Sequence, residues 1–589
     1  DNTISIGIDF GTTYSGVAFT WSKKVDNIEV LASWDSELPS NCDEDKTPTA
    51  ISLSRKGKVS WGYNIPFGEE HAKWFKLLLI DDQDLPDEVR CSTKIYEARA
   101  YLKKYNITTV EAIAQYLRHL WNHAVQRISD TVSRNLVQYS RFQIVMTLPA
   151  IWPEYARCRM RDAAKQAGML ATRAAGETEL LFISEPEAAA LATLADMDGR
   201  SDIKAGDTFV VADCGGGTAD IISYEVVSIS PMVVKECVQG QGSLCGAVFV
   251  DEGFAEILER KFGSKMWSKM SAETRHRLFH DEWENGIKSA FDGREKIWKL
   301  MVPYECLNPR SLMLDGFLPR ITLTTKDVRG AFDPVLDKIH LMVDEQVAAV
   351  HAIKGKGPKY VILVGGFGRS AYLLATLKEH LGRGIEVLQS RGSKPWTAIC
   401  RGAVIYAATL NGVSAFPVQV QARVSRLNCG IKQMSYWSKS KHIQADKVWN
   451  EPRQTWMADN QMQWFLKIGD EISTTKPVRY AFALDYEPGE AATMAHTKIL
   501  CTDTAGQVSD RWDASMRVLC TIKWDSEIAV SSLRTFTNCL GKVYHSLDFE
   551  VEMTCAGGSL DFAVYHDGKR QGSKNVVVDY ESSRSSHIF

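Results

Sequence analysis

Hydrophobic positions along the chain follow three patterns, and each pattern predicts a different kind of element. Near-continuous apolar runs at 142–149 and 360–364 are typical of strands inside a sheet that is covered on both faces. Around 108–137, apolar residues recur at three- and four-residue steps, which indicates a helix with one buried face. After about residue 415, apolar and polar positions alternate with a period of two, which predicts antiparallel strands. The pattern therefore predicts an α/β body followed by an all-β region.

Local signals indicate where further elements of the α/β body begin and end. Pro153 predicts the start of a helix, and residues 183–186 end a strand that leads into an alanine-rich helix. Thr324 and Asp327 match a capping box, so another helix is expected to begin there. A last helix over 395–410 is expected to end this body.

The strands expected after residue 415 carry apolar side chains at every second position. Four runs show the alternation: Met462, Trp464, Leu466 and Ile468; Tyr480, Phe482, Leu484 and Tyr486; Met516, Val518, Cys520, Ile522 and Trp524; and Leu547, Phe549, Val551 and Met553. Such repetition predicts an antiparallel β-sandwich. Because nothing helical of any length follows in the sequence, we expect no helical lid over this sandwich.

Composition is that of an ordinary globular protein. The 589 residues carry a net charge of −3, which gives no reason to expect nucleic-acid binding. No apolar run approaches the roughly 18–20 residues that a membrane span needs, and the chain opens directly into a strand without a visible signal peptide. The 13 cysteines include no C-x-x-C pair, which favours reduced thiols. We therefore expect a cytoplasmic protein without nucleic-acid or membrane partners.

Two segments that lie about two hundred residues apart share one unusual pattern. Residues 6–18 and 210–222 each hold an apolar strand that ends in an aspartate (Asp9 or Asp213), then glycines, a threonine and a second apolar run. Glycines allow a tight turn whose backbone N–H groups point at an anion. The aspartate can hold a hydrated Mg²⁺, directly or through water. Two such turns that face each other would bind a nucleoside triphosphate from both sides.

These two turns belong to a set of five motifs whose order along the chain is informative. The set comprises a first phosphate motif at 8–15, a first connecting motif at 146–150, a second phosphate motif at 213–220, an adenosine motif at 363–370 and a second connecting motif at 401–403. In this order the motifs resemble the Hsp70/actin/sugar-kinase ATPase superfamily, and most closely the divergent Hsp70-like proteins of class twelve. The resemblance covers roughly residues 4–412.

The resemblance implies an α/β, actin-like fold with two lobes, each built on a duplicated ribonuclease-H-like β-sheet core, and ATP in the cleft between them. We therefore expect lobe I at residues 1–200 and lobe II at 201–412, with a helical insertion at about 251–300. Residues 413–589 are expected to form a β-sandwich-like C-terminal domain.

The resemblance also implies catalytic roles for five residues. Asp9 and Asp213 would position Mg²⁺ through its waters. Lys76 resembles the lysine that orients the attacked γ-phosphate and its water. Glu185 occupies the place of an acid near the hinge, and Asp220 resembles its second acidic partner. Phosphoryl transfer needs little covalent help from the protein, so Mg²⁺, one lysine and oriented N–H groups suffice.

Further residues are expected to contact ATP or ADP. The phosphates would approach Gly11, Thr12, Thr13, Tyr14, Gly215, Gly216, Gly217 and Thr218, and the nucleoside would approach Lys288, Gly365, Gly366, Phe367 and Arg369. The nucleoside half departs from the family pattern, because Phe367 replaces a small hydroxyl residue and Trp396 replaces an acid. The phosphate half is therefore expected to be intact and the nucleoside half remodelled.

Each of these features also has an ordinary structural explanation. The two aspartates could cap local N–H groups of their own turns, and Lys76 could be solvated. Glu185 could cap its own helix. Phe367 and Trp396 could pack against each other as core instead of forming a rim that stacks on a base. The aromatic tract 436–465 is either sandwich core or a binding groove.

Three functions fit this sequence. The first is an Hsp70-like ATPase that couples closure of its lobes to a protein client on the β-rich domain. The second is an ATP-dependent enzyme that transfers the γ-phosphate to a hydroxyl or carboxyl group of a small molecule, and so drives a dehydration or condensation. The third is a scaffold that binds nucleotide without turnover. Because Lys76, Asp9, Asp213 and Asp220 are all retained, the sequence favours the first function over the third.

Overall fold

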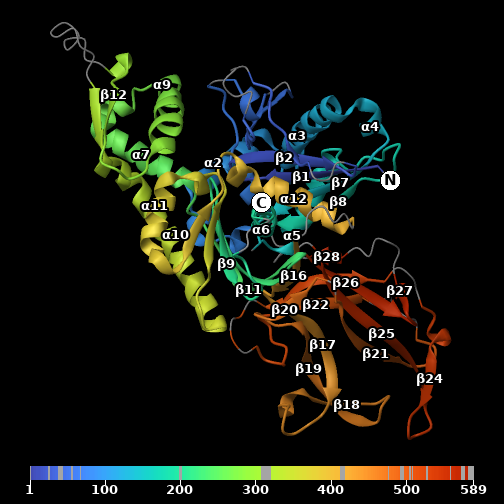
Figure 1. Cartoon of the computed structure of the whole chain (residues 1–589). Coiled ribbons are helices and arrows are strands. Elements are labelled where there is room, and N and C mark those ends of the chain that lie inside the picture. Colours follow the sequence, from blue (N-terminus) through green and yellow to red (C-terminus); the bar gives the residue numbers. More distant parts are fainter. Residues whose placement is uncertain are drawn as a thin grey trace, which may run out of the picture. The chain divides into compact units, whose positions relative to one another are not determined.

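The computed structural model divides the chain into two units, which are described separately (Figure 1). Unit 1 comprises Asp1–Trp152 and Arg159–Val420, and unit 2 comprises Pro153–Cys158 and Gln421–Phe589. The structure describes residues 2–580 except 24–26, 37–43, 55–56, 67, 151, 198–201, 307–319, 412–417, 475, 491–495, 503, 505, 507, 525–527, 557–558 and 572–577. The predicted domain boundaries at 200/201 and 412/413 lie outside the described residues.

The first sheet of unit 1 has the order β3–β2–β1–β7–β8. Its strands are β1 (Thr3–Phe10), β2 (Tyr14–Trp21), β3 (Glu29–Val30), β7 (Arg141–Leu148) and β8 (Glu179–Ser184), with β4 (Thr47–Pro48) paired to β2. β1 runs antiparallel to β2 and parallel to β7, and β7 runs parallel to β8. The apolar run at 142–149 thus forms a buried central strand, as predicted.

A second sheet in unit 1 repeats this arrangement. Its first five strands have the order β15–β14–β9–β10–β11, and they comprise β9 (Thr208–Cys214), β10 (Ala219–Ile229), β11 (Met232–Ser243), β14 (Tyr360–Val364) and β15 (Glu386–Gln389). β9 runs antiparallel to β10 and parallel to β14, as β1 does to β2 and β7. Two sheets with the same order and the same strand directions are what a duplicated, two-lobed actin-like fold requires, so the predicted fold class is confirmed.

Two helices that follow the last strands of the sheets cross in direct contact. The alanine-rich helix α6 (Glu185–Asp196) follows β8, and α12 (Lys394–Leu410) follows β15, both as predicted. A Cβ added at Gly402 of α12 would lie 1.7 Å from the carbonyl oxygen of Ala188 in α6. The two backbones can approach this closely only because position 402 has no side chain.

The remaining helices of unit 1 flank the sheets. They are α1 (Asp87–Arg90), α2 (Thr93–Tyr105), α3 (Thr109–Val132), α4 (Arg134–Gln138), α7 (Ala247–Phe262), α8 (Ser264–Trp267), α9 (Ala272–Arg277), the π-helix η5 (Leu278–Lys288), α10 (Thr325–Lys354) and α11 (Ala371–Leu381); α5 (Glu154–Gln166) follows Pro153. The capping box predicted at the start of α10 is present, since Thr324 and Asp327 exchange hydrogen bonds. No helix among the described residues is long and apolar enough to cross a bilayer.

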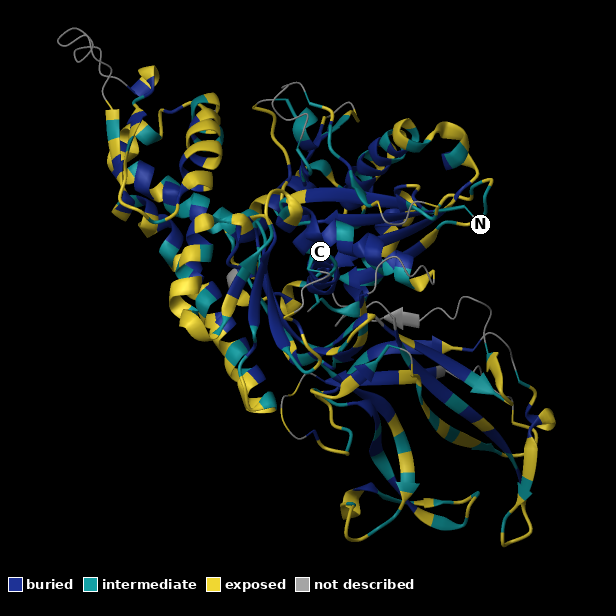
Figure 2. Cartoon of the chain, viewed as in Figure 1, coloured by how far each residue is buried: buried dark blue, intermediate teal, exposed yellow. Residues whose placement is uncertain are grey.

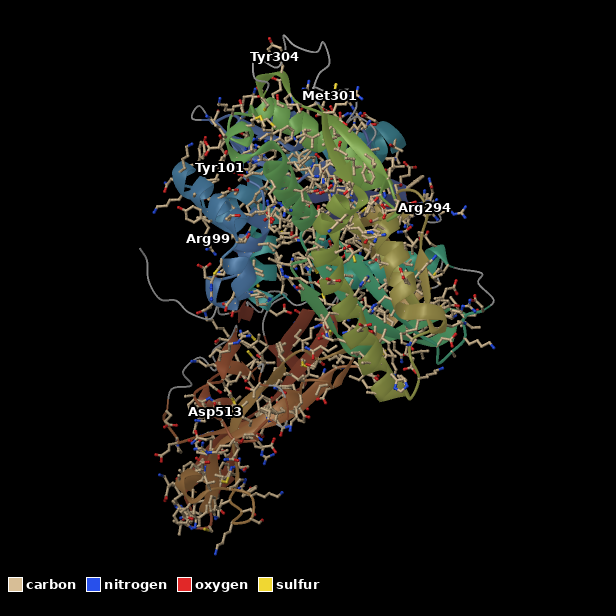
Figure 3. The ribbon with its side chains drawn as sticks, turned by 90° about the vertical axis from the view of Figure 1, so that its left-hand side faces the viewer. Arg99, Tyr101, Arg294, Met301, Tyr304 and Asp513 are labelled. Carbon is tan, nitrogen blue, oxygen red and sulfur yellow. The ribbon has the colours of Figure 1, made fainter. Side chains whose placement is uncertain are left out.

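Short 3₁₀ turns and two small sheets complete unit 1. They are η2 (Gly62–Asn64), η3 (Phe75–Leu79), η4 (Asp82–Asp84), η6 (Tyr304–Cys306), η7 (Phe367–Arg369), η8 (Gly382–Gly384), the pair β5 (Ile51–Leu53) and β6 (Val59–Trp61), and the pair β12 (Ile297–Met301) and β13 (Arg320–Thr324). Met301 and Tyr304 lie at the outer end of the β12–β13 pair, where both are exposed (Figure 3).

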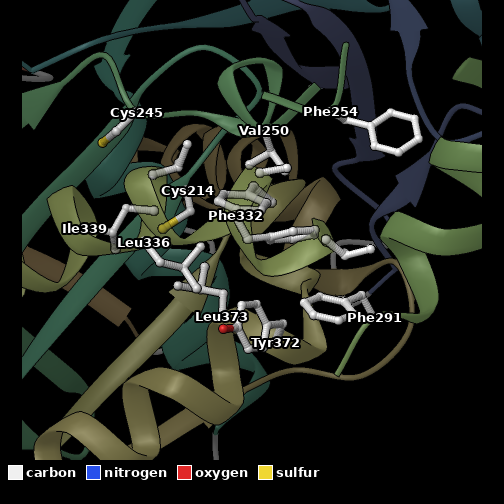
Figure 4. Packing of buried hydrophobic residues seen from close by; sticks show 14 of the residues in the cluster. Cys214, Cys245, Val250, Phe254, Phe291, Phe332, Leu336, Ile339, Tyr372 and Leu373 are labelled. Atoms are coloured by element: carbon white, nitrogen blue, oxygen red, sulfur yellow. The ribbon is translucent and has the colours of Figure 1, made fainter. Parts of the chain in front are cut away.

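The core of the second lobe lies between its sheet and helices α7, α10 and α11 (Figure 4). Phe254 of α7 stacks on Trp283 of η5 with their ring centroids 3.8 Å apart. Phe332 of α10 contacts Tyr372 of α11, whose hydroxyl donates a hydrogen bond to Asp333. The central strands of both sheets are almost entirely buried, and exposed positions gather on the outer faces of the helices (Figure 2).

Unit 2 contains two antiparallel sheets that share one hydrophobic core. The first has the order β18–β19–β17–β22–β23–β28, and the second has the order β21–β25–β26–β27, with β24 paired to β25. The strands of these two sheets are β17 (Asn428–Tyr436), β18 (Lys447–Asn450), β19 (Thr455–Leu466), β21 (Val478–Tyr486), β22 (His496–Thr502), β23 (Arg517–Lys523), β24 (Arg534–Thr537), β25 (Val543–Ala556), β26 (Ser559–His566), β27 (Lys569–Gln571) and β28 (Val578–Tyr580). Outside these two sheets, β16 (Val418–Val424) pairs with β20 (Glu471–Ser473). The shared core includes Phe465 of β19 and Phe562 of β26. The all-β character predicted for this region is confirmed.

From residue 421 onward, the described residues contain only two helical turns, η9 (Gln444–Asp446) and η10 (Val530–Ser532).

Candidate nucleotide site

The two Asp-Gly-Thr turns predicted from the sequence lie against each other in unit 1. One turn connects β1 to β2, and the other connects β9 to β10. A Cβ added at Gly216 would lie 2.1 Å from Oγ1 of Thr13, so the second turn approaches the first at a distance that only glycine permits. The structure therefore brings together two segments that are far apart in the sequence.

The backbone of these turns offers hydrogen-bond donors. In the second turn, the carbonyl oxygens of residues 215–217 accept hydrogen bonds from the first N–H groups of α7, at 2.9–3.2 Å. Within the described residues, the N–H groups of Thr12, Thr13, Gly216 and Gly217 donate no hydrogen bond. Unpaired N–H groups next to a helix start fit a phosphate anion, because the anion completes their hydrogen bonds.

Four carboxylates gather where the turns meet. Asp9 ends β1, Asp213 lies near the end of β9, and Asp220 lies opposite Asp213 in the β9–β10 register. Glu185 begins α6, and all four residues are buried. Burial raises the pKa of Asp213 well above its usual range, and the charges of Glu185, Asp220 and Asp9 raise it further.

The residues at Asp213 fit a hydrated cation. Its Oδ1 atom is buried and has no hydrogen-bond partner in the part of the chain that the structure describes. In the ligand-free protein this environment favours the protonated carboxyl, whereas a cation or its waters close to the oxygen would favour the ionised form. A Mg²⁺ ion carried by a polyphosphate would satisfy this oxygen through water, as the sequence predicts.

Lys76 and Glu185, two of the predicted catalytic residues, form a buried ion pair. Nζ of Lys76 lies 2.6 Å from Oε1 of Glu185, and the lysine side chain is 1% exposed. Lys76 lies in η3, and its ammonium also approaches the rings of Phe10 and Trp152 at 5.8 and 5.3 Å. Burial raises the pKa of Glu185, and the charge of Lys76 partly offsets this rise. Lys76 is therefore not a solvated surface lysine.

A second buried lysine, Lys46, was not anticipated from the sequence. Its Nζ contacts Oδ2 of Asp9, and both side chains are almost fully buried. Burial lowers the pKa of Lys46, but the charge and hydrogen bond of Asp9 outweigh this effect and the pKa is raised. Lys46 reaches Asp9 because Thr47 in β4 pairs with Ser15 in β2. This pairing is non-local, so the sequence contains no clear signal for it.

Trp74 is a further residue that sequence reasoning missed. Its φ is 66°, which is unusual for a bulky side chain. Its ring packs 6.3 Å from that of Phe249 and lies 3.2 Å from the position of a Cβ added at Gly217. The unfavourable backbone thus places an aromatic ring from lobe I against the second turn and the start of α7.

The adenosine motif lies beside the second turn, and its phenylalanine is buried in the core. Gly365 has a φ of 85°, and a Cβ there would lie 2.4 Å from Oδ1 of Asp213. Phe367 is buried in the core of the second lobe, with its ring 6.2 Å from that of Phe332. Phe367 is thus part of the core with Phe332 as its ring neighbour, whereas the core alternative expected it to pack against Trp396, whose ring meets Tyr14; its contact with the nucleoside stays a prediction.

Trp396 lies near residues that the sequence assigns to the nucleotide. Its ring meets that of Tyr14 edge-on at 5.7 Å, and the Arg369 guanidinium lies 5.7 Å from its centroid. Tyr14 follows the first turn and is 38% exposed. Tyr14, Arg369 and Trp396 therefore form a partly open surface of the kind that stacks on a planar ring.

Lys288, the predicted nucleoside contact on η5, is already paired with two acids. Its ammonium lies 2.8 Å from Asp251 and 2.6 Å from Glu284. Burial lowers the pKa of Lys288, but these two carboxylates outweigh it and raise the pKa.

Comparison with known proteins assigns the family. The model of the family described as "Hsp70 protein" matches residues 85–466. Human heat shock 70 kDa protein 12B is 24% identical over 86% of this chain and 82% of its own length. Mouse heat shock 70 kDa protein 12A is 24% identical over 74% of this chain and 73% of its own length. The chaperone protein DnaK of Thermosipho africanus (strain TCF52B) is 26% identical over 69% of this chain and 59% of its own length.

The family match and the geometry agree. The match spans well over half of the chain and includes Glu185, Asp213, Asp220 and the adenosine motif. Similarity to two class-twelve proteins confirms the resemblance stated from the motifs. This chain belongs to the Hsp70 family of ATP-binding proteins.

Proposed function

We propose that unit 1 binds ATP between its two Asp-Gly-Thr turns and hydrolyses it, and that hydrolysis controls the binding of a protein client by unit 2. Membership of the Hsp70 family supports ATP binding and ATPase activity in general. The observation that carries the assignment to this site is the direct contact of the two turns, with unpaired N–H donors on both sides.

The buried ion pair gives the site its chemistry. In this proposal, the Lys76 ammonium orients the γ-phosphate and the attacking water, and Glu185 holds that ammonium in place. Asp213 holds the waters of a magnesium ion, which neutralises charge on the phosphates when it is bound. The N–H groups of the two turns donate hydrogen bonds to the phosphate oxygens.

The crossing helices provide a route for coupling. Glu185 is the first residue of α6, and α6 touches α12 at Gly402. A nucleotide that changes the contacts of Glu185 would therefore act on this helix pair. Coupling to a client requires that the pair adopts different positions before and after hydrolysis.

An exposed apolar patch on unit 2 supports a protein client. Met434, Tyr436, Ile443, Trp449 and Trp456 are each between 44% and 65% exposed, and they come from β17–β19 and the segments that join them. The rings of Trp449 and Trp456 meet edge-on at 5.1 Å, and Lys447 lies 4.4 Å from the Trp456 ring. Exposed aromatic and apolar side chains on neighbouring strands are typical of a binding surface.

Turnover of ATP with and without an unfolded polypeptide tests the proposal. We expect basal phosphate release that rises when the polypeptide is added. Phosphate release that requires a small hydroxyl- or carboxyl-bearing metabolite would instead favour the phosphotransferase. If nucleotide binds but neither mixture releases phosphate, the result would favour the third function, a scaffold that binds nucleotide without hydrolysing it. A cytoplasmic location stays a prediction from the sequence.

A further inference from the structure

Trp74, a residue of lobe I, packs where the two phosphate turns meet. Its buried indole ring meets the ring of Phe249 in α7 at 78°, with the ring centroids 6.3 Å apart. A Cβ added at Gly217 of the second turn would lie 3.2 Å from Cη2 of Trp74 and 3.4 Å from Cγ2 of Thr12 in the first turn. The indole therefore lies directly against the backbone of a turn that is expected to hold phosphate.

Trp74 also begins the turn that carries Lys76. The residue immediately precedes η3, and its carbonyl oxygen accepts a hydrogen bond of 3.2 Å from the N–H group of Leu77. Lys76 lies between the two residues that this bond joins, so the bond limits the positions that its backbone can take. The two ends of the lysine are thus held separately, since Trp74 anchors the backbone and Glu185 pairs with the ammonium.

The backbone at Trp74 is unfavourable for a bulky side chain. Its φ is 66° and its ψ is 3°, in the left-handed region that such residues rarely adopt. A conformation of this kind persists where the surrounding packing holds it, and it occurs most often at functional sites. Because these two angles set the direction of the chain into η3, loss of the packing around the indole would allow η3 and Lys76 to shift together.

The aromatic contact is the main link between Trp74 and lobe II. A second link runs through Lys94 of α2, whose ammonium lies 5.8 Å from the centroid of the Trp74 ring and 2.9 Å from Oε1 of Glu252 in α7. The side chains of Lys94 and Glu252 are 24% and 43% exposed, and ion pairs that are open to solvent contribute little. The position of the indole therefore depends on Gly217 and Phe249 more than on this pair.

We infer that Trp74 is a positioning residue for Lys76. Its indole, held by Phe249 and the second phosphate turn, fixes the turn that presents the lysine. Lys76 is therefore in place only while the second phosphate turn packs against lobe I. This inference rests on the role of Lys76 in the proposed function. A donor stabilises a transferred phosphate most when it is oriented in advance, so loss of the indole should slow the chemical step and leave nucleotide affinity nearly unchanged.

Single-turnover hydrolysis of Mg²⁺-ATP by the full chain tests the inference in a double-mutant cycle. Trp74→Ala is expected to slow the chemical step by about tenfold, with the dissociation constant of ATP within about threefold of the wild type. In a Lys76→Ala background, the same substitution is expected to change the remaining rate by less than about twofold, because Trp74 acts through the lysine. Trp74→Phe, which keeps a ring at this position, should recover most of the lost rate.

Two further variants complete the experiment. Tyr96→Ala removes a 74% exposed aromatic side chain of α2 and should hydrolyse ATP at the wild-type rate. Phe249→Leu removes the ring on lobe II that the indole meets, and it takes the place of Trp74→Ala in the cycle if circular dichroism shows that Trp74→Ala does not fold. We expect Phe249→Leu to slow hydrolysis in the wild-type background and not in Lys76→Ala.

The outcomes separate the inference from the proposed function. A wild-type rate in folded Trp74→Ala overturns the positioning role and leaves the proposed site intact. Equal slowing by this substitution with and without Lys76 overturns it as well, because the indole would then act on the phosphate turn or the fold instead of the lysine. Unchanged hydrolysis in Lys76→Ala overturns the proposed role of the lysine itself, and the inference with it.

Discussion

Nζ of Lys76 lies 2.6 Å from Oε1 of Glu185, although 109 residues separate the two in the sequence. The pair joins a 3₁₀ turn of lobe I to the first residue of α6. In the proposed mechanism, the ammonium that Glu185 holds also donates to a bound γ-phosphate, so occupancy of the site would act on the first residue of α6.

Replacement of Lys76 by alanine tests this pair. Lys76→Ala should leave nucleotide affinity nearly unchanged and slow hydrolysis by about 100-fold or more, because one oriented donor to the transferred phosphate is lost. It should also lower the free energy of unfolding by about 3–5 kcal/mol, because Glu185 stays buried without a partner. Single-turnover hydrolysis and chemical denaturation measure the two effects.

A double variant separates catalysis from stability. Lys76→Ala combined with Glu185→Gln should recover much of the stability, since position 185 no longer carries an unpaired buried charge, but it should not recover the rate. Lys103→Ala, on an exposed position of α2, serves as the control. A defect of Lys76→Ala that is confined to affinity would contradict the assigned role.

Asp213→Asn should abolish Mg²⁺-dependent hydrolysis and at the same time stabilise the ligand-free protein at neutral pH. The pKa of Asp213 is raised in the folded state, so the folded protein binds more protons than the unfolded chain at pH values above about 4. The free energy of unfolding of the wild type therefore falls as the pH rises from about 4 toward the raised pKa of Asp213. In Asp213→Asn this fall should be absent, because the amide at position 213 does not ionise. Thermal unfolding of both proteins between pH 4 and pH 8 measures the effect. Unchanged turnover in the variant would show that the site is misassigned.

Gly402→Ala should disturb both the fold and hydrolysis. The new methyl group would overlap the carbonyl oxygen of Ala188, and separation of α6 from α12 should cost about 1–3 kcal/mol. Because α6 begins at Glu185, we expect slower hydrolysis as well. Gly357→Ala is the matched control, since a Cβ there meets nothing within 4 Å and its stability should change by less than about 0.5 kcal/mol. Equal melting temperatures for the two variants would argue against the crossing.

The exposed aromatic patch of unit 2 can be tested apart from the nucleotide site. Trp449→Ser combined with Trp456→Ser should weaken binding of an unfolded polypeptide by about tenfold and leave basal hydrolysis unchanged. Tyr139→Ser, at a 63% exposed position of unit 1, is the control for the loss of a surface aromatic. Fluorescence anisotropy of a labelled polypeptide measures the affinity. Equal affinities in the variant and the control would remove the patch from the proposal.

Much of the fold was predictable because its signals are local. The glycine-rich turns, the capping box at Thr324 and the apolar strand that became β14 each depend on residues close together in the sequence. The alternation after residue 415 depends on the two-residue period of a strand, and it predicted the strands of the sandwich. For the aromatic tract, the same alternation left the choice between core and surface open: Trp464 is buried, whereas Trp449 and Trp456 are exposed.

The sequence by itself determined the apolar central strands, several helix starts, the two Asp-Gly-Thr turns and the alternation of the last region, because backbone preferences and side-chain periods act over a few neighbouring residues. Tertiary structure alone decided that Lys46 pairs with Asp9, that Lys76 pairs with Glu185, and that the ring of Phe367 faces the core. Each of these facts depends on packing between segments that are distant in the sequence, where burial favours the pairing of opposite charges and large rings must find space.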